Sequence, residues 1–272
     1  MIIETPESHE IEVAQNPQPH KDMNLRRIII HAYLYGPYLF HRFSGTGAFG
    51  RPKARYIDSP IPSGGNSLKA ALIRHHVKQF HESSCSVASV VSVVNAIRDV
   101  KAGGQLPITQ RDILEEVRTG HWKERMSDQG HNGRRGLPLP LLGEIVESSL
   151  DAYRVPYAAV ETVQAQRKPG LPEEIKATLR RRLFEFETRG NGLIIAHFDQ
   201  GALVPVLNIP HISPVGGFDT QSGDVIVLDV DPEQKRPYSV TFDTFCKSLF
   251  SNYNPMLKLF GYISGGYVYI KL

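Results

Sequence analysis

The stretch QFHESSCSVASVVSVVNAI, residues 79–97, joins a polar segment to an apolar run that begins at a cysteine. Aliphatic residues in this run recur at intervals of three and four: Val87, Val90, Val91, Val94 and Ile97. Their spacing marks one face of a helix and predicts an α-helix over residues 85–99. Cys85 would then stand at the helix N-terminus, where free N–H groups and the helix dipole favour a thiolate. The alternative for Cys85 is a small buried residue that only packs.

The composition is that of an ordinary soluble globular protein with a sizeable core. The chain has 272 residues, of which 41% are hydrophobic and 22% are charged. Its net charge of +3 is spread along the chain and argues against nucleic-acid binding. Two cysteines favour free thiols in a reducing compartment over a disulfide scaffold. Because no secretory signal is visible and no apolar stretch approaches the roughly 20 residues that cross a bilayer, we expect a cytoplasmic protein without a membrane segment.

The order of the predicted elements favours an α+β fold, with helices first and strands afterwards. Residues 1–24 lack periodicity and predict a flexible arm, which leaves residues 25–272 as a single domain. Helices are predicted over residues 67–80, with Ser67 as candidate N-cap, 85–99, 107–118, 137–155 and 171–187. The β-prone segments are residues 26–40, 192–198, 211–218, 224–231 and 266–272. Residues 45–66 and 120–136 are predicted to be loops.

A histidine and two aspartates flank a predicted hairpin turn. The turn DTQSG, residues 219–223, joins the β-prone segments that carry His211 and Asp229. His211 lies ten residues before position 221 and Asp229 lies eight after it, so folding at the turn brings the two together. A carboxylate beside an imidazole fixes its tautomer and stabilises its charged form. Asp231 would share a strand face with Asp229, so spacing alone does not decide which of the two contacts His211. The alternative is that the histidine and the aspartate lie at a sheet edge without a joint function.

An amide side chain precedes the cysteine. Gln79 lies six residues before Cys85, one loop upstream of the predicted helix. Acyl transfer develops negative charge on a carbonyl oxygen, which a side-chain amide and a backbone N–H can stabilise. Gln79 is therefore a candidate oxyanion donor, and a solvent-facing glutamine at a helix end is the alternative. In the order Gln79, Cys85, His211 and Asp229, the candidates resemble the catalytic set of papain-like cysteine peptidases, with an acid in place of the usual Asn.

The motifs around these residues resemble those of the phytochelatin synthases. The segment around Cys85, Q-x5-C-S-V-A-S-V-V-S-V-V-N-A-I, is similar to the family's Q-x5-C-G-[VL]-A-[ST] and its downstream L-N-[AS]-L. The segment that begins at His211, H-I-S-P-V-G-G-F, is similar to the family's H-[FI]-S-P-[LI]. V-I-V-L-D-V is similar to L-I-[LM]-D-V, with the aspartate eighteen residues after the histidine (211 + 18 = 229), which selects Asp229 over Asp231. The resemblance runs from about residue 60 to the C-terminus. It indicates a divergent, prokaryotic-type member without the cysteine-rich C-terminal domain.

The resemblance implies a papain-like fold, with a helical lobe over about 60–190 and a β-sheet lobe over about 191–272. Cys85 would be the nucleophile, His211 the general base and then acid, and Asp229 the residue that orients His211; Gln79 and the Cys85 N–H would form the oxyanion hole. In that family the cysteine attacks the Cys–Gly bond of glutathione and releases glycine. Water or an amine then resolves the γ-glutamylcysteinyl thioester. The family chemistry implies no required cofactor. Heavy-metal ions would enter only as thiolate complexes of the substrate. The sequence does not decide whether the protein forms a homodimer.

The chain departs from the family where a substrate carboxylate would bind. Pro210 stands where members carry glycine, and Pro232 stands where they carry arginine. The family's R-G-F has only FGY or GGY, residues 260–262 or 265–267, as counterparts. Lys235 or Arg236 would have to replace the missing arginines. These departures motivate two alternatives: an acyltransferase or amidase of the same fold acting on another small substrate in a biosynthetic pathway, and a non-enzymatic binding module.

Other polar motifs carry weaker signals. HESSC, residues 81–85, lacks the second histidine of a zinc motif, and we expect no metal there. RHH (74–76) and GHNGRRG (130–136) are interpreted as solvated surface. Cys246 lies beside Phe245 in a predicted helix, and we expect it to pack in the core.

Overall fold

The protein is described by a computed structural model that covers residues 35–41, 43–47, 50–103, 106–165, 171–206, 208–251, 253, 257 and 262–272. The predicted arm, residues 1–24, lies outside this set, as do residues 26–34 of the first β-prone segment. The remainder of that segment, residues 35–40, is helical rather than extended.

A seven-stranded antiparallel sheet forms the centre of the molecule, in the order β1-β6-β5-β4-β3-β7-β2. The strands are β1 (Arg55–Tyr56), β2 (Ala159–Gln164), β3 (Gly192–Asp199), β4 (Pro210–Phe218), β5 (Asp224–Val227), β6 (Tyr238–Thr241) and β7 (Gly266–Lys271). All six strand pairs are antiparallel. β3 is buried along its whole length, because helices cover both faces of the sheet at its centre.

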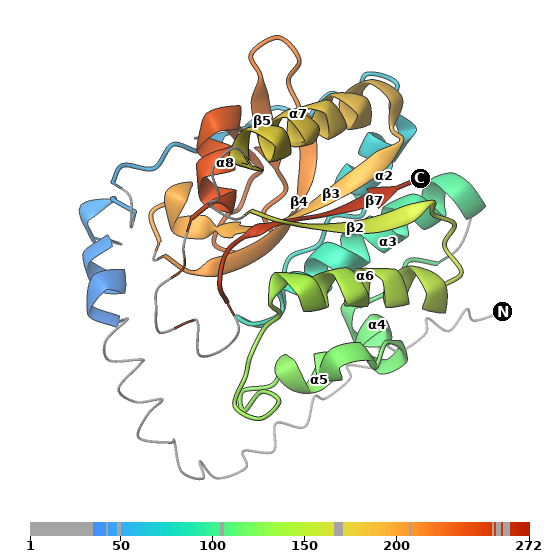
Figure 1. Cartoon of the computed structure of the whole chain (residues 1–272), viewed down its shortest axis with the longest axis horizontal. Coiled ribbons are helices and arrows are strands. Elements are labelled where there is room, and N and C mark those ends of the chain that lie inside the picture. The colour runs from blue at the N-terminus through green and yellow to red at the C-terminus, as the bar shows by residue number, and fades with distance from the viewer. Residues whose placement is uncertain are drawn as a thin grey trace, which may run out of the picture.

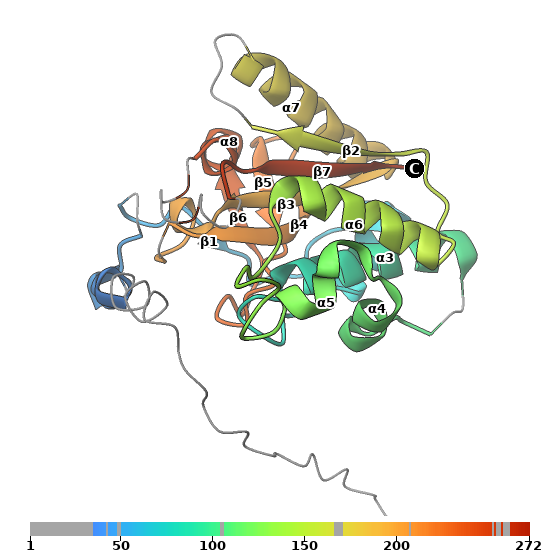
Figure 2. The same cartoon turned by 60° about the horizontal axis from the view of Figure 1, so that its bottom comes forward.

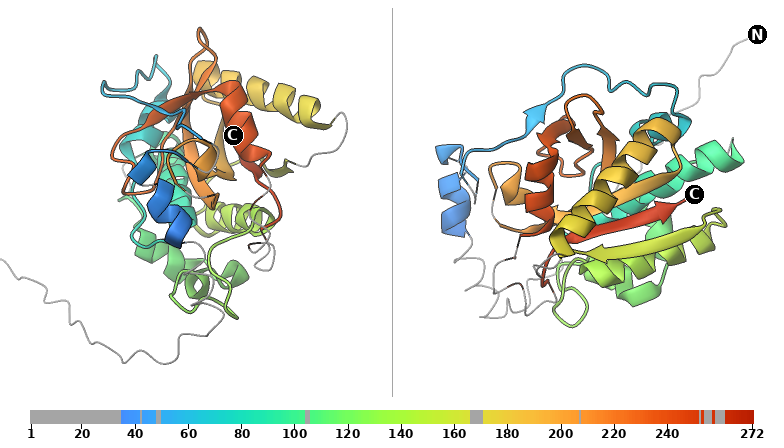
Figure 3. Two further views of the ribbon diagram at one scale, coloured as in Figure 1. Left: turned by 90° about the vertical axis from the view of Figure 1, so that its left-hand side faces the viewer. Right: turned by 45° about the horizontal axis from the view of Figure 1, so that its top comes forward.

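Helices lie on both faces of the sheet (Figures 1 and 2). They are α2 (Ser67–Arg74), α3 (Cys85–Ala102), α4 (Gln110–Glu116), α5 (Trp122–Arg125), α6 (Leu139–Ala152), α7 (Leu171–Arg189) and α8 (Phe242–Leu249). α3 packs on β4 and α6 packs on β2 and β7 on one face. α7 and α8 cover the other face, side by side in the right-hand view of Figure 3. The predicted α+β architecture is confirmed.

Strand alternation divides the interior into two cores. Leu193 and Ile195 of β3 pack with α3 and α6, whereas Ile194 and Phe198 pack with α7 and α8. β4 divides in the same way, and Ile212 faces the α3 side. The start of α3 is thereby held against the middle of the sheet. The division into lobes at about residue 190 stays a prediction.

The helix predicted from residue 85 is confirmed as α3, although valine has a low helix propensity. Nearly all of its first thirteen residues are buried, so tertiary packing outweighs propensity. The helices predicted over 107–118, 137–155 and 171–187 form as α4, α6 and α7 with shifted ends.

The helix predicted over residues 67–80 is too long, because α2 ends at Arg74. Asn66, not Ser67, is the N-cap, and its side chain accepts the Lys69 N–H at 2.9 Å. Beyond the helix, backbone N–H groups bond outside their own segment: that of Gln79 donates to the Val230 carbonyl at 2.8 Å. These tertiary bonds replace the helical ones that the sequence pattern predicted.

Two predicted loops contain regular structure. In residues 120–136, a helical turn (Thr119–His121) leads into α5, because Trp122 is fully buried and its indole N–H donates to Ser86 Oγ at 3.1 Å. In residues 45–66, β1 pairs with β6 at the sheet edge. Two further strands, β2 and β6, were not predicted. No helix in the described part of the chain is long and apolar enough to cross a membrane.

Candidate active site

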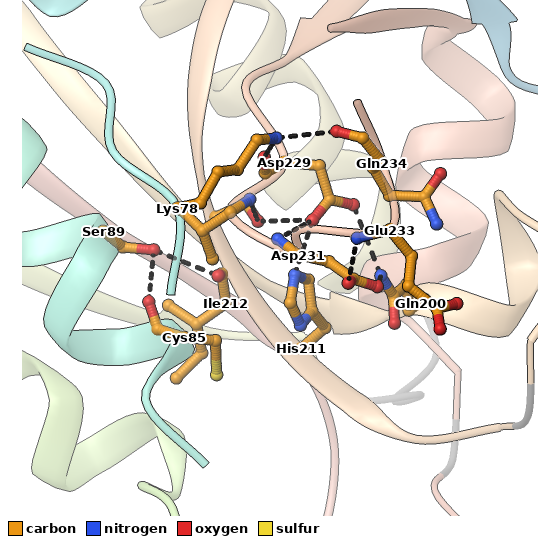
Figure 4. Close-up of polar contacts among 12 residues, drawn as sticks. Lys78, Cys85, Ser89, Gln200, His211, Ile212, Asp229, Asp231, Glu233 and Gln234 are labelled. Atoms are coloured by element: carbon orange, nitrogen blue, oxygen red, sulfur yellow. Dashed lines mark hydrogen bonds and ion pairs between the residues drawn. The ribbon is translucent and has the colours of Figure 1, made fainter. Parts of the chain in front are cut away.

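Cys85 is the first residue of α3, as predicted, and follows the N-cap Ser84. Its thiol is half-buried and free of any disulfide. Ser89, one turn later, donates its hydroxyl to the Cys85 carbonyl at 2.8 Å and to the Ile212 carbonyl at 3.0 Å. Ser89 thereby fixes the start of α3 against β4, the strand that carries His211 (Figure 4). The positive end of the helix dipole faces this position.

His211 lies near the start of β4 and is 5% exposed. Its Nε2 is 2.7 Å from Asp229 Oδ1, and the ring lies between Asp229 and Cys85 in Figure 4. Burial alone would lower the pKa of His211. The charge of Asp229 and hydrogen bonds to Asp229 and Cys85 outweigh that effect and raise the pKa to about 10. The imidazolium is therefore the favoured form of the ring near neutral pH.

Asp229 follows the end of β5 and is completely buried. Burial would raise its pKa, but His211 and several hydrogen bonds lower the pKa of this carboxyl to about 2. Besides His211, Oδ1 accepts the Asp231 N–H at 2.9 Å. Oδ2 accepts the Tyr238 hydroxyl at 2.7 Å and lies 3.4 Å from the Gln200 amide nitrogen. The carboxylate is thus ionised, oriented and shielded from water.

Asp231 does not contact His211. One of its carboxylate oxygens accepts the Gln200 amide at 3.0 Å, and the other accepts the Glu233 N–H at 2.9 Å. The predicted hairpin is confirmed, with Val215 opposite Val227, and its register shifts at a bulge between Val215 and Gly217. The hydrogen bond of His211 therefore selects Asp229, which spacing alone left open.

Gln79 lies beside this group because its N–H donates to the Val230 carbonyl at 2.8 Å. Its side chain lines the same cleft as Cys85 and His211. The side-chain Oε1 is buried and has no hydrogen-bond partner within the described residues. The four residues predicted from sequence thus come together, three lining the cleft and Asp229 behind His211.

The cleft has a volume of about 370 Å³. Besides the three polar residues above, its walls include Tyr38, Phe80 and Pro210. Tyr38 comes from the helical segment at residues 35–41, ahead of the first strand. Phe80 directly follows Gln79, whose side-chain oxygen is buried, but the Phe80 side chain is 60% exposed. The cleft is thus open to solvent and partly aromatic.

Sequence reasoning missed three residues that support the Asp229 carboxylate or its backbone. They are Tyr238, Gln200 and Lys78, whose ammonium group donates to the carbonyls of Asp229 and Gln234. Burial lowers the pKa of Lys78, although nearby aspartates oppose this effect. Tyr238 lies on β6, a strand that the sequence patterns did not predict, so no local signal pointed to its role.

The remaining polar motifs serve local structure. RHH is not simple solvated surface: Arg74 and His75 both contact Asp99, and burial lowers the pKa of His76 to about 4. Cys246 is buried in α8 as predicted, and burial raises the pKa of its thiol to about 12. In the part of the chain that the structure covers, no three His, Cys, Asp or Glu residues gather as metal ligands.

The family model for phytochelatin synthase matches residues 61–254, which is more than half of the chain. The chain belongs to the phytochelatin synthase family. Members of this family are γ-glutamylcysteine transferases, so the family-level role is a glutathione-related transpeptidase. No curated protein matches the chain. The matched region contains Gln79, Cys85, His211 and Asp229, whereas Tyr38 of the cleft wall precedes it.

Neither candidate replacement for the phytochelatin synthase arginines lines the cleft. Arg236 forms an ion pair with Asp58 and lies over the ring of Tyr56 at 5.4 Å. Lys235 is exposed and is absent from the cleft walls. Pro232, which the resemblance aligns with one of these arginines, itself lines the cleft. The cleft walls thus include no lysine or arginine among the described residues.

Proposed function

We propose that the protein is a papain-like cysteine peptidase or acyltransferase that cleaves a small thiol peptide, such as glutathione, through a thioester on Cys85. The observation that carries this proposal is the contact chain from Asp229 through His211 to Cys85 at the N-terminus of α3. A buried carboxylate, an imidazole and a thiol in this order form a nucleophile with its base and the group that orients the base.

The chemistry follows from these contacts. The imidazole of His211 already holds the proton of the Cys85 thiol, and the thiolate of this ion pair attacks the carbonyl carbon of the scissile amide. The Gln79 amide and the Cys85 N–H stabilise the oxyanion, each such donor being worth about 3 kcal/mol in favourable cases. The imidazolium of His211 then protonates the leaving amine, the C–N bond breaks, and a thioester remains.

The thioester is resolved by a second nucleophile. Water or an amine attacks the acyl carbon while His211 accepts its proton, and the sulfur leaves as a thiolate. Hydrolysis gives the free acid, and transfer to an amine gives a longer peptide. Asp229 keeps the ring of His211 oriented and stabilises its charge in both steps. Any heavy-metal ion would enter as a thiolate complex of the substrate. The free thiol of Cys85 fits a reducing, cytoplasmic compartment.

A second candidate function is transfer from another small amide substrate by the same four residues. It is favoured by the cleft walls, which carry no arginine or lysine among the residues described. A glutathione carboxylate would meet no guanidinium or ammonium group among these wall residues.

Intact-mass spectrometry tests the acyl-enzyme directly. Purified protein is mixed with glutathione and with a panel of small peptides and amides, and both released amine and the mass of the protein are followed. We expect an acyl adduct that maps to Cys85, and its loss in Cys85→Ala. Cys246→Ala is the matched control and retains the adduct. If no substrate acylates Cys85, the proposed chemistry is wrong.

A further inference from the structure

A largely buried guanidinium lies next to the cleft without a full set of partners. Arg135, in the loop between α5 and α6, has a side chain that is 21% exposed. Its Nε and Nη2 atoms are buried and have no hydrogen-bond acceptor among the described residues. A buried N–H without an acceptor costs free energy, so these groups favour a further acceptor. The motif GHNGRRG, interpreted from sequence as solvated surface, therefore contains one residue that is not.

Glu82 joins Arg135 to the cleft wall. Its carboxylate pairs with Arg135 Nη1 at 2.5 Å, and Glu82 lines the cleft three residues before Cys85. Arg135 itself is not among the wall residues. The Glu82 side chain is 66% exposed, and exposed side chains change rotamer rapidly. The Glu82 carboxylate can therefore turn away and leave the guanidinium to another carboxylate.

The backbone on both sides of this ion pair is fixed. Ser84 Oγ accepts the His81 N–H at 2.9 Å and donates to the His81 carbonyl at 2.8 Å, which closes the turn that carries Glu82. The Tyr262 hydroxyl donates to the Arg135 carbonyl at 3.0 Å. The guanidinium is thus held near the cleft, while the side chain that pairs with it is exposed.

The other cation of the cleft is engaged within the site. The imidazolium of His211 faces the Asp229 carboxylate at 2.7 Å and the Cys85 thiol, and both raise its pKa. It therefore serves the nucleophile rather than a substrate carboxylate. Asp128, the second acid near Arg135, lies 3.9 Å from Nη2, which is too long for a hydrogen bond. Arg135 thus keeps donors to spare beside the cleft.

On the basis of the proposed function, we propose that Arg135 determines substrate specificity by binding a free carboxylate of a small peptide substrate in place of the Glu82 carboxylate. A guanidinium binds a carboxylate through two parallel N–H bonds, and Arg135 has unused donors for them. Glu82 is then a displaceable partner, which keeps the guanidinium paired when the cleft holds no carboxylate. A neutral amide substrate leaves the pair of Glu82 and Arg135 in place.

The exchange of one carboxylate for another makes the discrimination by the wild type weak. Binding of the substrate carboxylate forms one ion pair with Arg135 and breaks another of similar strength. Glu82→Gln removes the competing pair. Because a partly exposed ion pair changes a rate constant by up to about fivefold, Glu82→Gln should raise the ratio of acid to amide rate constants about fivefold. The rise should shrink as salt concentration increases.

Glutathione and two of its methylamides test this inference, one blocked at the glycine carboxyl and the other at the α-carboxyl of the γ-glutamyl residue. The second-order rate constant for acylation of Cys85 is measured for each by intact-mass spectrometry. The ratio of glutathione to each methylamide is compared between wild type and variants, so that intrinsic differences between the probes cancel. We expect Glu82→Gln to raise one of the two ratios about fivefold. If Cys85 is acylated but neither ratio rises, this inference is overturned while the proposed function stands. If no probe acylates Cys85, the proposed function fails, and this inference fails with it.

A double variant separates binding by Arg135 from simple repulsion by Glu82. In Glu82→Gln with Arg135→Gln, the raised ratio should return to within about twofold of the wild type, because no guanidinium is left to bind the acid. The milder Glu82→Gln with Arg135→Lys should lose at least half of the rise, because an ammonium group cannot form two parallel bonds. The methylamide rates report whether each variant is folded. Arg134→Gln in the Glu82→Gln background removes an exposed neighbouring charge and is the matched control, which should keep the full rise. A raised ratio that persists without Arg135 would show that Glu82 only repels acids, and would overturn the assignment.

Discussion

Replacing Tyr238 with phenylalanine removes one hydrogen bond from the catalytic candidate Asp229 and leaves the ring in place. The hydroxyl of Tyr238 donates to Asp229 Oδ2 at 2.7 Å, and both side chains are fully buried. After the change, Gln200, at 3.4 Å, is the remaining donor near that oxygen among the described residues. A hydrogen bond to a buried charge contributes roughly 1.5–3 kcal/mol. A loss of about 2 kcal/mol corresponds to a fall in melting temperature of about 4–8 °C for a chain near this size.

Urea unfolding at constant m-value measures this loss. The stability difference between wild type and Tyr238→Phe should also depend on pH, because the folded-state pKa of Asp229 is about 2, below its ordinary value. The stability that this carboxylate contributes is present above about pH 3.9 and is lost as the pH falls through about 2. The difference between wild type and Tyr238→Phe should therefore be constant from pH 5 to 8, on the order of 2 kcal/mol, and should shrink below about pH 4.

Tyr157→Phe is the matched control. It removes the same phenol-to-carboxylate hydrogen bond, to Asp151 at 2.9 Å, from an exposed pair. We expect Tyr157→Phe to lose less than half the stability that Tyr238→Phe loses, because water replaces the bond at an exposed site. Acylation of Cys85 should slow only in Tyr238→Phe. Equal stability losses in the two variants, or an unchanged acylation rate in Tyr238→Phe, would refute the role given to the buried bond.

Alkylation, a double mutant and alkaline unfolding test the other parts of the site. Iodoacetamide should label Cys85 before Cys246, which is buried and has a raised pKa of about 12; a peptide map with Cys246 labelled first would contradict the assignment. His211→Ala combined with Asp229→Ala should acylate little more slowly than His211→Ala alone, because both act through one imidazole; additive losses would reopen Asp231. The stability that the His211 imidazolium contributes is complete below about pH 6.5 and is lost as the pH rises through about 10. The urea concentration at the unfolding midpoint of the wild type should therefore fall over that pH range. The midpoint of His211→Gln should fall less. Parallel curves would show that the imidazolium contributes no stability.

The sequence by itself determined the features that depend on local patterns. The valine spacing predicted α3 and placed Cys85 at its first residue, because helical periodicity is a property of one continuous segment. The turn DTQSG predicted the hairpin, in which Gly223 has a φ of 76° that favours glycine. His211 and Asp229 could be brought near each other on this basis, because a hairpin joins neighbours in the chain.

Only the tertiary structure decided which groups touch. The sequence predicted a strand over residues 224–231 with Asp229 and Asp231 on one face, but β5 ends at Val227 and both aspartates lie beyond it. The choice between them depends on the bulge beside Val215 and on the bonds that Tyr238 and Gln200 make. The sequence also did not predict β2, which exists because it pairs with β7 about a hundred residues later (Val160 with Ile270). Contacts of this kind join segments far apart in the chain, and no local period or turn encodes them. The partly aromatic walls of the cleft arise in the same way, from segments that meet only when the chain folds.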